Sequence, residues 1–300
     1  MTWSQSLGVE HKEIPLVSIS RDQQSHSVGK PNFIANVYHG IPIDLYKFIE
    51  KPNTERPYLA FLGRISDSKL PDWAIQIAIK AGYHLKMAAR FDKGDKYWEE
   101  TIKPLIEKNK DIVEFVGEIN DKQKNEFLGN ALAFLFPINW PEPFGMVMIE
   151  SMACGTPVIA RRTGSVPEVI EDGISGILFD TIEQGVEAVN SAKEMDRSVV
   201  RKAFENRFTV STMADNYLKV TLFATTDSIT SAKLVAKWPA FNKSSAPMER
   251  YEWTYDQVRK NVTKFDILHF HTDEILEVID DIVKENKTSC VVTIHTPIEF

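Results

Sequence analysis

The stretch "PEPFGMVMIE" at residues 141–150 places two carboxylates, Glu142 and Glu150, eight positions apart around an expected helix start. A helix that begins near Gly145 would put Glu150 about one and a half turns inside it. A carboxylate accepts both hydroxyl protons of a vicinal diol well, at roughly 1.5 to 3 kcal/mol per charged hydrogen bond. The alternative is that Glu142 complements the helix dipole and that Glu150 is a solvated helix residue.

Two cations, Arg64 and Lys69, lie in "GRISDSKLPDW", between an expected strand and an expected helix with Pro71 at its first position. A helix N-terminus with free N–H groups, together with a guanidinium and an ammonium, is suited to bind a diphosphate. Carboxylates on both sides of such a site could hold two diols of one ligand. The alternative is that both cations are solvated on a surface loop.

Three histidines form a second candidate cluster. His269 and His271 lie on one face of an expected strand in "DILHFHT", and His295 ends another in "VVTIHT". Neighbouring parallel strands would present these imidazoles to the same cleft. Zinc is one alternative, although no Cys or carboxylate stands at the spacing of a fourth ligand. Core histidines that are hydrogen-bonded to backbone are the other.

The elements that must position these residues follow a regular pattern from about residue 57 to about residue 220. Apolar runs ("YLAFLG", "HLKMAA", "IVEFVG", "LAFLFPI", "PVIAR", "GILF") alternate with amphipathic stretches, and Trp73, Ile77 and Ala81 are spaced as one buried helix face. Such alternation predicts an α/β, Rossmann-like domain whose parallel sheet is covered on both faces. Ligands bind such sheets at the carboxyl ends of the strands. Neither G-x-G-x-x-G nor a P-loop motif is present, which argues against a dehydrogenase and an NTPase.

Composition narrows the function classes further. The chain has 300 residues, of which 43% are hydrophobic, so it is long and apolar enough to form two domains. Its net charge of −7 argues against a nucleic-acid partner. The two cysteines, Cys154 and Cys290, show neither CxxC nor zinc spacing. Neither a secretory signal nor an apolar run approaching the roughly 20 residues of a membrane span is found. We therefore expect a soluble, cytoplasmic protein.

Together these motifs resemble a known family. Glu142 and Glu150 form an E-x7-E motif in "PEPFGMVMIESMACGTPVIARRTGSVPEVIEDGISGIL". With "GRISDSK" upstream, residues 55–218 resemble the nucleotide-sugar-binding domain of GT-B glycosyltransferases of family 4, the glycosyl transferases group 1 type. The resemblance implies two Rossmann-like domains. It also implies a retaining, metal-independent transfer of sugar from a nucleoside diphosphate sugar, without a cofactor. The acceptor (a small molecule, a glycan or a lipid-linked compound at a membrane surface) is not implied.

The resemblance also implies roles for individual residues. Arg64 and Lys69 would hold the diphosphate and stabilise the leaving group, Glu142 and the backbone after Phe144 would hold the sugar, and Glu150 the ribose. His295 would line the cleft near the transferred sugar, with His271 and His269 beside it. In the family pattern a glycine usually follows the lysine, whereas this chain has Leu70. The expected catalytic residues are Arg64, Lys69, Glu142 and His295; the expected donor-binding residues are Arg64, Lys69, Gly117, Glu118, Glu142, Phe144, Gly145, Met146, Val147 and Glu150.

The flanking segments resemble the same family in a different order. "VTLFATTDSITSAKLVAKWP", "FDILHFHT" and "VVTIHTP" resemble the N-terminal acceptor domain, yet they follow the donor domain here. We therefore expect a circular permutant in which residues 1–48 and 221–300 form the acceptor domain around a donor domain at 49–220. This acceptor domain would lack the family's first strand, glycine-rich loop and helix. The permutation predicts that "PLVSI" and "VVTIHT" share one sheet, whereas a fusion of two glycosyltransferase fragments predicts no shared sheet.

Two functions remain in competition. The first is a glycosyltransferase, and the second is a non-catalytic nucleotide-sugar-binding protein or an inactive glycosyltransferase fragment, suggested by the absent segment. An epimerase or phosphorylase of GT-B shape ranks lower, because no motif marks the lysine-bound pyridoxal phosphate site that a phosphorylase needs.

Overall fold

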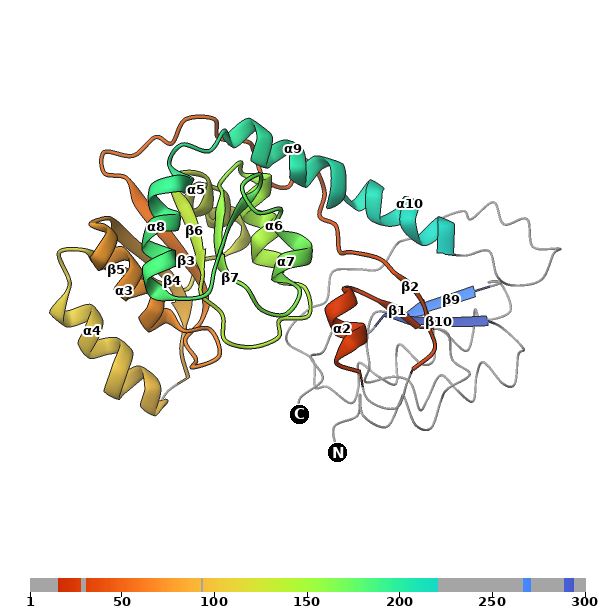
Figure 1. Ribbon diagram of the computed structural model, residues 1–300, viewed down its shortest axis with the longest axis horizontal. Helices are drawn as coiled ribbons and strands as arrows, with labels where there is room; N and C mark the ends of the chain where they lie inside the picture. The colour runs from red at the N-terminus through yellow and green to blue at the C-terminus, as the bar shows by residue number, and fades with distance from the viewer. Residues whose placement is uncertain (1–15, 28–30, 93, 221–266, 271–288, 294–300) are drawn as a thin grey trace. The chain divides into compact units, whose positions relative to one another are not determined.

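The computed structural model describes residues 16–27, 31–92, 94–220, 267–270 and 289–293 (Figure 1). The chain divides into two compact units. The first falls within Met1–Ile19, Gln24–Val37 and Asn216–Phe300, and the second comprises Ser20–Gln23 and Tyr38–Asp215. The predicted domain boundaries at residues 48 and 220 stay predictions.

The second unit is built on a six-stranded parallel sheet with the strand order β5-β4-β3-β6-β7-β8. Each predicted apolar run forms one of these strands, which confirms the Rossmann-like prediction. The winding direction of such a sheet reverses where the first and fourth strands of the unit meet, here between β3 and β6. The strands are β3 (Tyr58–Arg64), β4 (His84–Arg90), β5 (Val113–Gly117), β6 (Ala133–Phe136), β7 (Val158–Arg161) and β8 (Gly176–Phe179).

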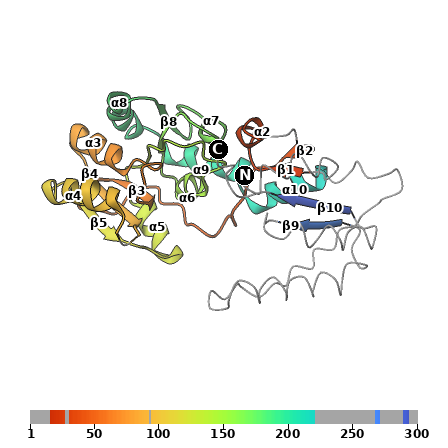
Figure 2. The ribbon, with the colours of Figure 1, turned by 90° about the horizontal axis from the view of Figure 1, so that it is seen from below.

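Helices cover both faces of this sheet. Figure 2 shows α3, α4 and α8 on one side and α5, α6 and α9 on the other, and α3 packs against α8 as α6 packs against α9. The helices are α3 (Pro71–Ala81), α4 (Lys103–Lys108), α5 (Asp121–Gly129), α6 (Met146–Ala153), α7 (Val166–Val169), α8 (Ile182–Ala192), α9 (Arg197–Arg207) and α10 (Val210–Val220), with a π-helical segment, η1 (Trp98–Ile102), directly before α4.

The buried face of α3 differs from the predicted one. Ile77 is fully buried, as expected, but Trp73 and Ala81 are only partly buried at the edge of the core. The fully buried residues of this helix also include Ala74 and Ala78. Because α3 contacts both the sheet and α8, small side chains face the closest approach and the large indole lies at the margin.

The first unit contains a four-stranded parallel sheet with the order β2-β1-β10-β9. Its strands are β1 (Leu16–Ser18), β2 (Phe33–Asn36), β9 (Ile267–Phe270) and β10 (Ser289–Thr293), and a short helix, α2 (Arg21–Ser25), follows β1. Leu16 pairs with Val292, and Val17 pairs with Thr293. The prediction that the segments around residues 16 and 292 share one sheet is therefore confirmed.

Candidate functional site

The loops that follow β3 and β6 meet where the winding of the sheet reverses. The backbone N–H of Asn139, after β6, donates a hydrogen bond of 2.7 Å to the carbonyl of Ser68, after β3. Beside this link, the Lys69 ammonium donates a hydrogen bond to the Glu142 carboxylate. Residues 73 positions apart in sequence are thus brought into direct contact. This contact lies at the carboxyl end of neighbouring parallel strands, where ligands bind in such folds.

The Lys69–Glu142 pair is largely shielded from water. The exposed side-chain fractions are 26% for Lys69 and 19% for Glu142, and the ammonium lies 5.5 Å from the centroid of the Phe136 ring. An ion pair gains strength as its surroundings lose water. The alternatives for these two residues, a solvated loop cation and a carboxylate that only complements a helix dipole, therefore fail.

The backbone of Glu142 is held in place by residues 164 and 165. The N–H of Ser165 donates a hydrogen bond of 3.0 Å to the Glu142 carbonyl. Gly164 has a φ of +55°, and a Cβ at this position would lie 2.5 Å from the Glu142 nitrogen. Only glycine fits both this conformation and this approach. Gly164 was missed from sequence, although its place in "TGSVPE", shortly after an expected strand, indicates a turn.

The helix start predicted near Gly145 is confirmed, since α6 begins at Met146. Gly145 has a φ of +80°, which favours glycine. Phe144 is buried, with His39 edge-on to its ring at 5.0 Å and Phe208 at 5.9 Å. Its side chain therefore packs in the unit, and any ligand contact at this position falls to the backbone.

The first helix residues and Glu150 differ in exposure. Met146 is exposed and Val147 is half-buried, whereas Glu150 is a buried charged residue. The Glu150 carboxylate lies 3.0 Å from the Lys124 ammonium. The alternative of a solvated helix residue is therefore wrong for Glu150.

Arg64 is the last residue of β3 and lies opposite Arg90 of β4. Its side chain is more than half exposed, and its guanidinium lies 3.9 Å from the Asp92 carboxylate. Within the described part of the chain, Arg64 pairs with Asp92 and not with Glu142 or Glu150. The structure thus places Arg64 at the same edge of the sheet as Lys69 but does not bring the two predicted cations together.

The loop after Lys69 has an unusual backbone. Leu70 has φ 45° and ψ 54°, and it is the only non-glycine residue of the described segments with a positive φ. The following helix, α3, begins with Pro71 at its first position, as predicted. A leucine in the left-handed region is strained, because its Cβ approaches the carbonyl oxygen. A glycine, which the resemblance leads us to expect after the lysine, would adopt this conformation without strain.

The remaining predicted residues lie at the end of β5 and in the first unit. Gly117 ends β5 with a φ of +75°, and Glu118 beside it is exposed. His269 lies in β9. His271 and His295 lie outside the described residues. Among the residues that are described, no three His, Cys, Asp or Glu side chains gather as metal ligands.

Three side chains at or near this edge were missed from sequence. Arg161 ends β7, lies over the Trp73 ring at 5.0 Å and donates a hydrogen bond to the side-chain oxygen of Asn139. Lys124 pairs with Glu150 from α5. Ligands bind such sheets at the carboxyl ends of the strands. The Arg at the end of "PVIAR" and the Asn directly after "LAFLFPI" stand at such ends and could have been predicted as site residues.

Comparison with known proteins shows to which family the chain belongs. Residues 42–207, more than half of the chain, match the model of the family "Glycosyl transferases group 1". The chain belongs to this family. Curated proteins similar to it include the D-inositol 3-phosphate glycosyltransferase of Mycolicibacterium smegmatis, 31% identical over 147 residues, which are 48% of this chain and 34% of that protein.

An uncharacterized 41.2 kDa protein in the cps region of Klebsiella pneumoniae is 26% identical over 204 residues, which are 63% of this chain and 55% of that protein. The chain therefore spans between about a third and about half of the length of these curated relatives.

Solved structures show the same fold. The Anabaena HepE structure with UDP and glucose matches with a TM-score of 0.56 at 19% identity, over 68% of this chain and 61% of that one. A glycosyltransferase from Rickettsia africae matches with a TM-score of 0.60 at 16% identity, over 73% of this chain and 65% of that one. These matches establish the α/β fold with its parallel Rossmann-like sheet. None of the helices in the described segments has the length and apolar character needed to cross a bilayer.

Proposed function

We propose that the second unit binds a nucleoside diphosphate sugar and that the chain transfers the sugar to an acceptor with retention of configuration and without a metal ion. The observation that carries this proposal is the Lys69–Glu142 contact at the reversal point of the sheet. Membership of the group 1 family supports it independently.

The contact favours a ligand that presents an anion and hydroxyl groups side by side. Lys69 offers three N–H donors, and Glu142 offers only acceptors. A diphosphate attached to a sugar has this order of groups, because its phosphate oxygens accept from the ammonium and its adjacent sugar hydroxyls donate to the carboxylate. Each side chain thereby exchanges its present partner for a ligand group of the same character.

Glu150 and Arg64 extend the site in two directions. Glu150 lies about one turn along α6 from the helix start and keeps a buried carboxylate, suited to a ribose diol. Arg64 at the end of β3 supplies a guanidinium for the diphosphate. Gly117, Glu118 and the first amides of α6, at Met146 and Val147, complete the proposed donor site.

In the proposed reaction the bond between the anomeric carbon of the sugar and the phosphate oxygen breaks. A bond from an acceptor oxygen forms on the same face. The acceptor proton moves to the leaving phosphate, so no protein base is required for this step. Lys69 and Arg64 stabilise the negative charge that develops on the leaving diphosphate.

The acceptor side of the proposal uses the first unit. We propose that residues 1–48 and 221–300 form a permuted acceptor domain, and the pairing of β1 with β10 supports this arrangement over a fusion of separate fragments. His295, with His271 and His269, is proposed to line the acceptor side.

A binding screen tests the donor site. UDP-, GDP- and ADP-sugars are titrated calorimetrically into the wild-type chain and into Glu142→Ala and Arg64→Ala. Glu183→Ala, an exposed carboxylate on α8 that pairs with Lys80, serves as the control. We expect at least one donor to bind, with about tenfold or greater loss in the two site variants and none in the control. Unchanged binding in both site variants would refute the donor-site assignment.

Turnover separates the two candidate functions. A transferase without its acceptor substrate is expected to hydrolyse the bound donor slowly. Release of the nucleoside diphosphate measures this hydrolysis. Tight donor binding with no release over hours would instead favour the non-catalytic binding protein.

A further inference from the structure

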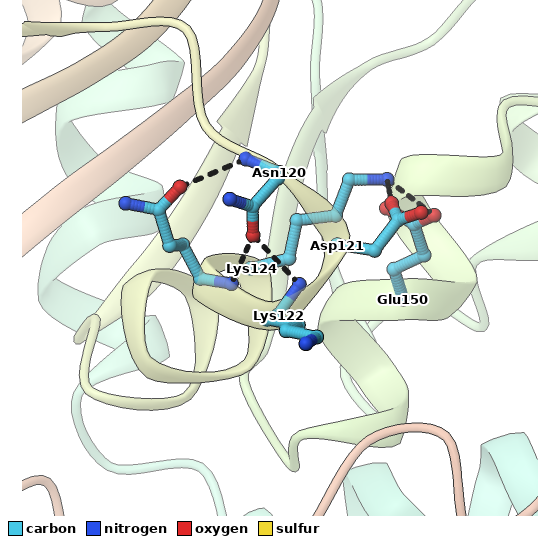
Figure 3. A network of polar contacts seen from close by, with 6 residues as sticks. Asn120, Asp121, Lys122, Lys124 and Glu150 are labelled. Atoms are coloured by element: carbon cyan, nitrogen blue, oxygen red, sulfur yellow. Dashed lines mark hydrogen bonds and ion pairs between the residues drawn. The ribbon is translucent and has the colours of Figure 1, made fainter.

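A partly buried charge network connects α5 to the proposed ribose side of the donor site. The Lys124 ammonium lies 3.0 Å from Oε1 of Glu150 and 3.1 Å from Oδ1 of Asp121 (Figure 3). The exposed side-chain fraction is 21% for Lys124 and 11% for Glu150, whereas Asp121 is 82% exposed. Glu150 therefore has a cationic partner on the neighbouring helix, away from the surface.

The first turn of α5 holds Lys124 in place. The Asn120 side chain accepts hydrogen bonds from the N–H groups of Lys122 and Gln123, at 3.0 and 3.2 Å. The Gln123 side chain in turn accepts the Asn120 N–H at 3.0 Å, completing a capping box (Figure 3). Asp121 and Lys124, three residues apart, lie on the same face of this fixed turn.

The charge state of the network follows from its contacts. Burial alone lowers the pKa of Lys124, but its hydrogen bonds to Glu150 and Asp121 and their charges outweigh that effect, so the pKa is raised. Burial, followed by the charges of Glu150 and Asp121, also raises the pKa of Tyr46, whose hydroxyl stays protonated. At neutral pH one ammonium thus serves two carboxylates.

We propose that Lys124 is a positioning residue that fixes the Glu150 carboxylate for a ribose diol and thereby sets the preference of the site for ribonucleotides over deoxyribonucleotides. A carboxylate offers about four acceptor sites on its two oxygens. Lys124 occupies one of those on Oε1 and the Tyr46 hydroxyl takes another, which leaves the remaining sites for ligand hydroxyls. This inference rests on the proposed function, since it requires that a nucleotide binds beside Glu150.

A positioning role and a purely structural role for Lys124 predict different changes in nucleotide affinity. A structural ion pair would, when removed, weaken the binding of every nucleotide by the same factor. A positioning role acts only on ligands that have the hydroxyl which Glu150 accepts. The ratio of ribonucleotide to deoxyribonucleotide affinity is therefore the diagnostic quantity.

The test uses UDP, GDP and ADP, each with its 2′-deoxy counterpart, titrated into the wild-type chain, Lys124→Met, Lys124→Arg and the control Lys122→Met. Lys122 is exposed on the same turn, and in the structure only its backbone N–H joins the network. We expect the wild-type chain to prefer a ribonucleotide by about tenfold, from one charged hydrogen bond. Lys124→Met should reduce this preference at least about fivefold, while Lys124→Arg and Lys122→Met keep it.

The possible failures are distinguishable. Absence of binding of any of these nucleotides to the wild-type chain would overturn the proposed function and this inference with it. Binding with the same preference in Lys124→Met as in the wild-type chain would overturn this inference alone. Lys124→Gln, which keeps a single donor toward Glu150, is the second variant if Lys124→Met does not fold: an intermediate preference supports the inference, and an unchanged one refutes it.

Discussion

Charged side chains in the second unit find their partners differently in two regions, α9 and the strand-end loops. On α9, the Arg197 guanidinium donates to the carbonyls of Ile49, Ala131 and Gly129 and to the Thr156 hydroxyl, at 2.6 to 2.9 Å. Arg201, one turn further on, donates to the carbonyls of Ile43 and Tyr46 at 2.9 and 3.0 Å. At the strand ends, by contrast, Lys69 pairs with Glu142, and Lys124 with Glu150.

This contrast shows how one unit combines stability with the proposed donor site. Carbonyls on several segments give Arg197 and Arg201 permanent neutral partners, and Arg201 also pairs with Glu205 one turn further along its own helix. These two cations therefore hold the fold together. In the proposed site, Lys69 and Glu142 satisfy one another only until a ligand supplies phosphates and hydroxyls, whereas Lys124 keeps its contact with Glu150. Variants of α9 should therefore affect folding, and variants of the strand-end loops should affect binding.

The largest effect is expected for Arg197→Met. Burial lowers the pKa of Arg197 to about 10, so the guanidinium is still charged at neutral pH. Its removal leaves three carbonyls and a hydroxyl without this donor, and we expect a loss of about 3 to 5 kcal/mol in the free energy of unfolding. Urea denaturation measures it. Lys202→Met, an exposed cation on the same helix, should change it by less than about 0.5 kcal/mol; equal losses in both would refute the structural role of Arg197.

The next effect is expected for Gly164→Ala. A Cβ here would lie 2.5 Å from the Glu142 nitrogen, while one at Gly173, which also has a positive φ, would have no atom of the described residues within 4 Å. Both substitutions cost about 1 to 2 kcal/mol in backbone strain, and Gly164→Ala should cost about 2 kcal/mol more because the Glu142 loop must move. Denaturation and donor titration of the two variants check this difference. If Gly164→Ala and Gly173→Ala behave alike, the Glu142 loop is not held as described.

A smaller effect concerns Leu70. In the left-handed region glycine is unstrained, so Leu70→Gly should be more stable than Leu70→Ala by about 1 kcal/mol. Comparison with alanine removes the contribution of the leucine side chain. Thermal or urea denaturation of both variants measures the difference, and an advantage for alanine would show that the loop does not keep its left-handed residue in solution.

The smallest effect is a pH dependence of the free energy of unfolding, caused by Cys154. Burial raises the pKa of the Cys154 thiol to about 12, whereas an unfolded thiol ionises near 8.5. The unfolded chain therefore loses this proton first, so the contribution of Cys154 to stability is present below about pH 8.5 and falls as pH rises toward 12. Between pH 7 and pH 9, the wild-type chain should lose about 0.8 kcal/mol more than Cys154→Ala. Parallel denaturation curves at these two pH values test it, and an identical loss in both chains would contradict a buried thiol.

Sequence predicted the second unit well because its signals are local. Six apolar runs became six strands, and Pro71 and Gly145 marked two helix starts. The Lys69–Glu142 contact was missed because it depends on how two loops 73 residues apart approach each other, which neither loop encodes alone. Arg197 and Lys124 were missed for a related reason: cations in amphipathic helices are usually solvated, and only the packing of other segments turns these two inward.

Hydrogen exchange with and without a saturating nucleoside diphosphate sugar tests the division between the two regions most directly. We predict slower exchange on binding in peptides that cover residues 64–72 and 140–151, where the diphosphate, sugar and ribose are placed. Peptides that cover residues 197–207 should be unchanged. Protection confined to residues 197–207, or no protection at residues 64–72 and 140–151 despite measured binding, would contradict the assignment of the donor site.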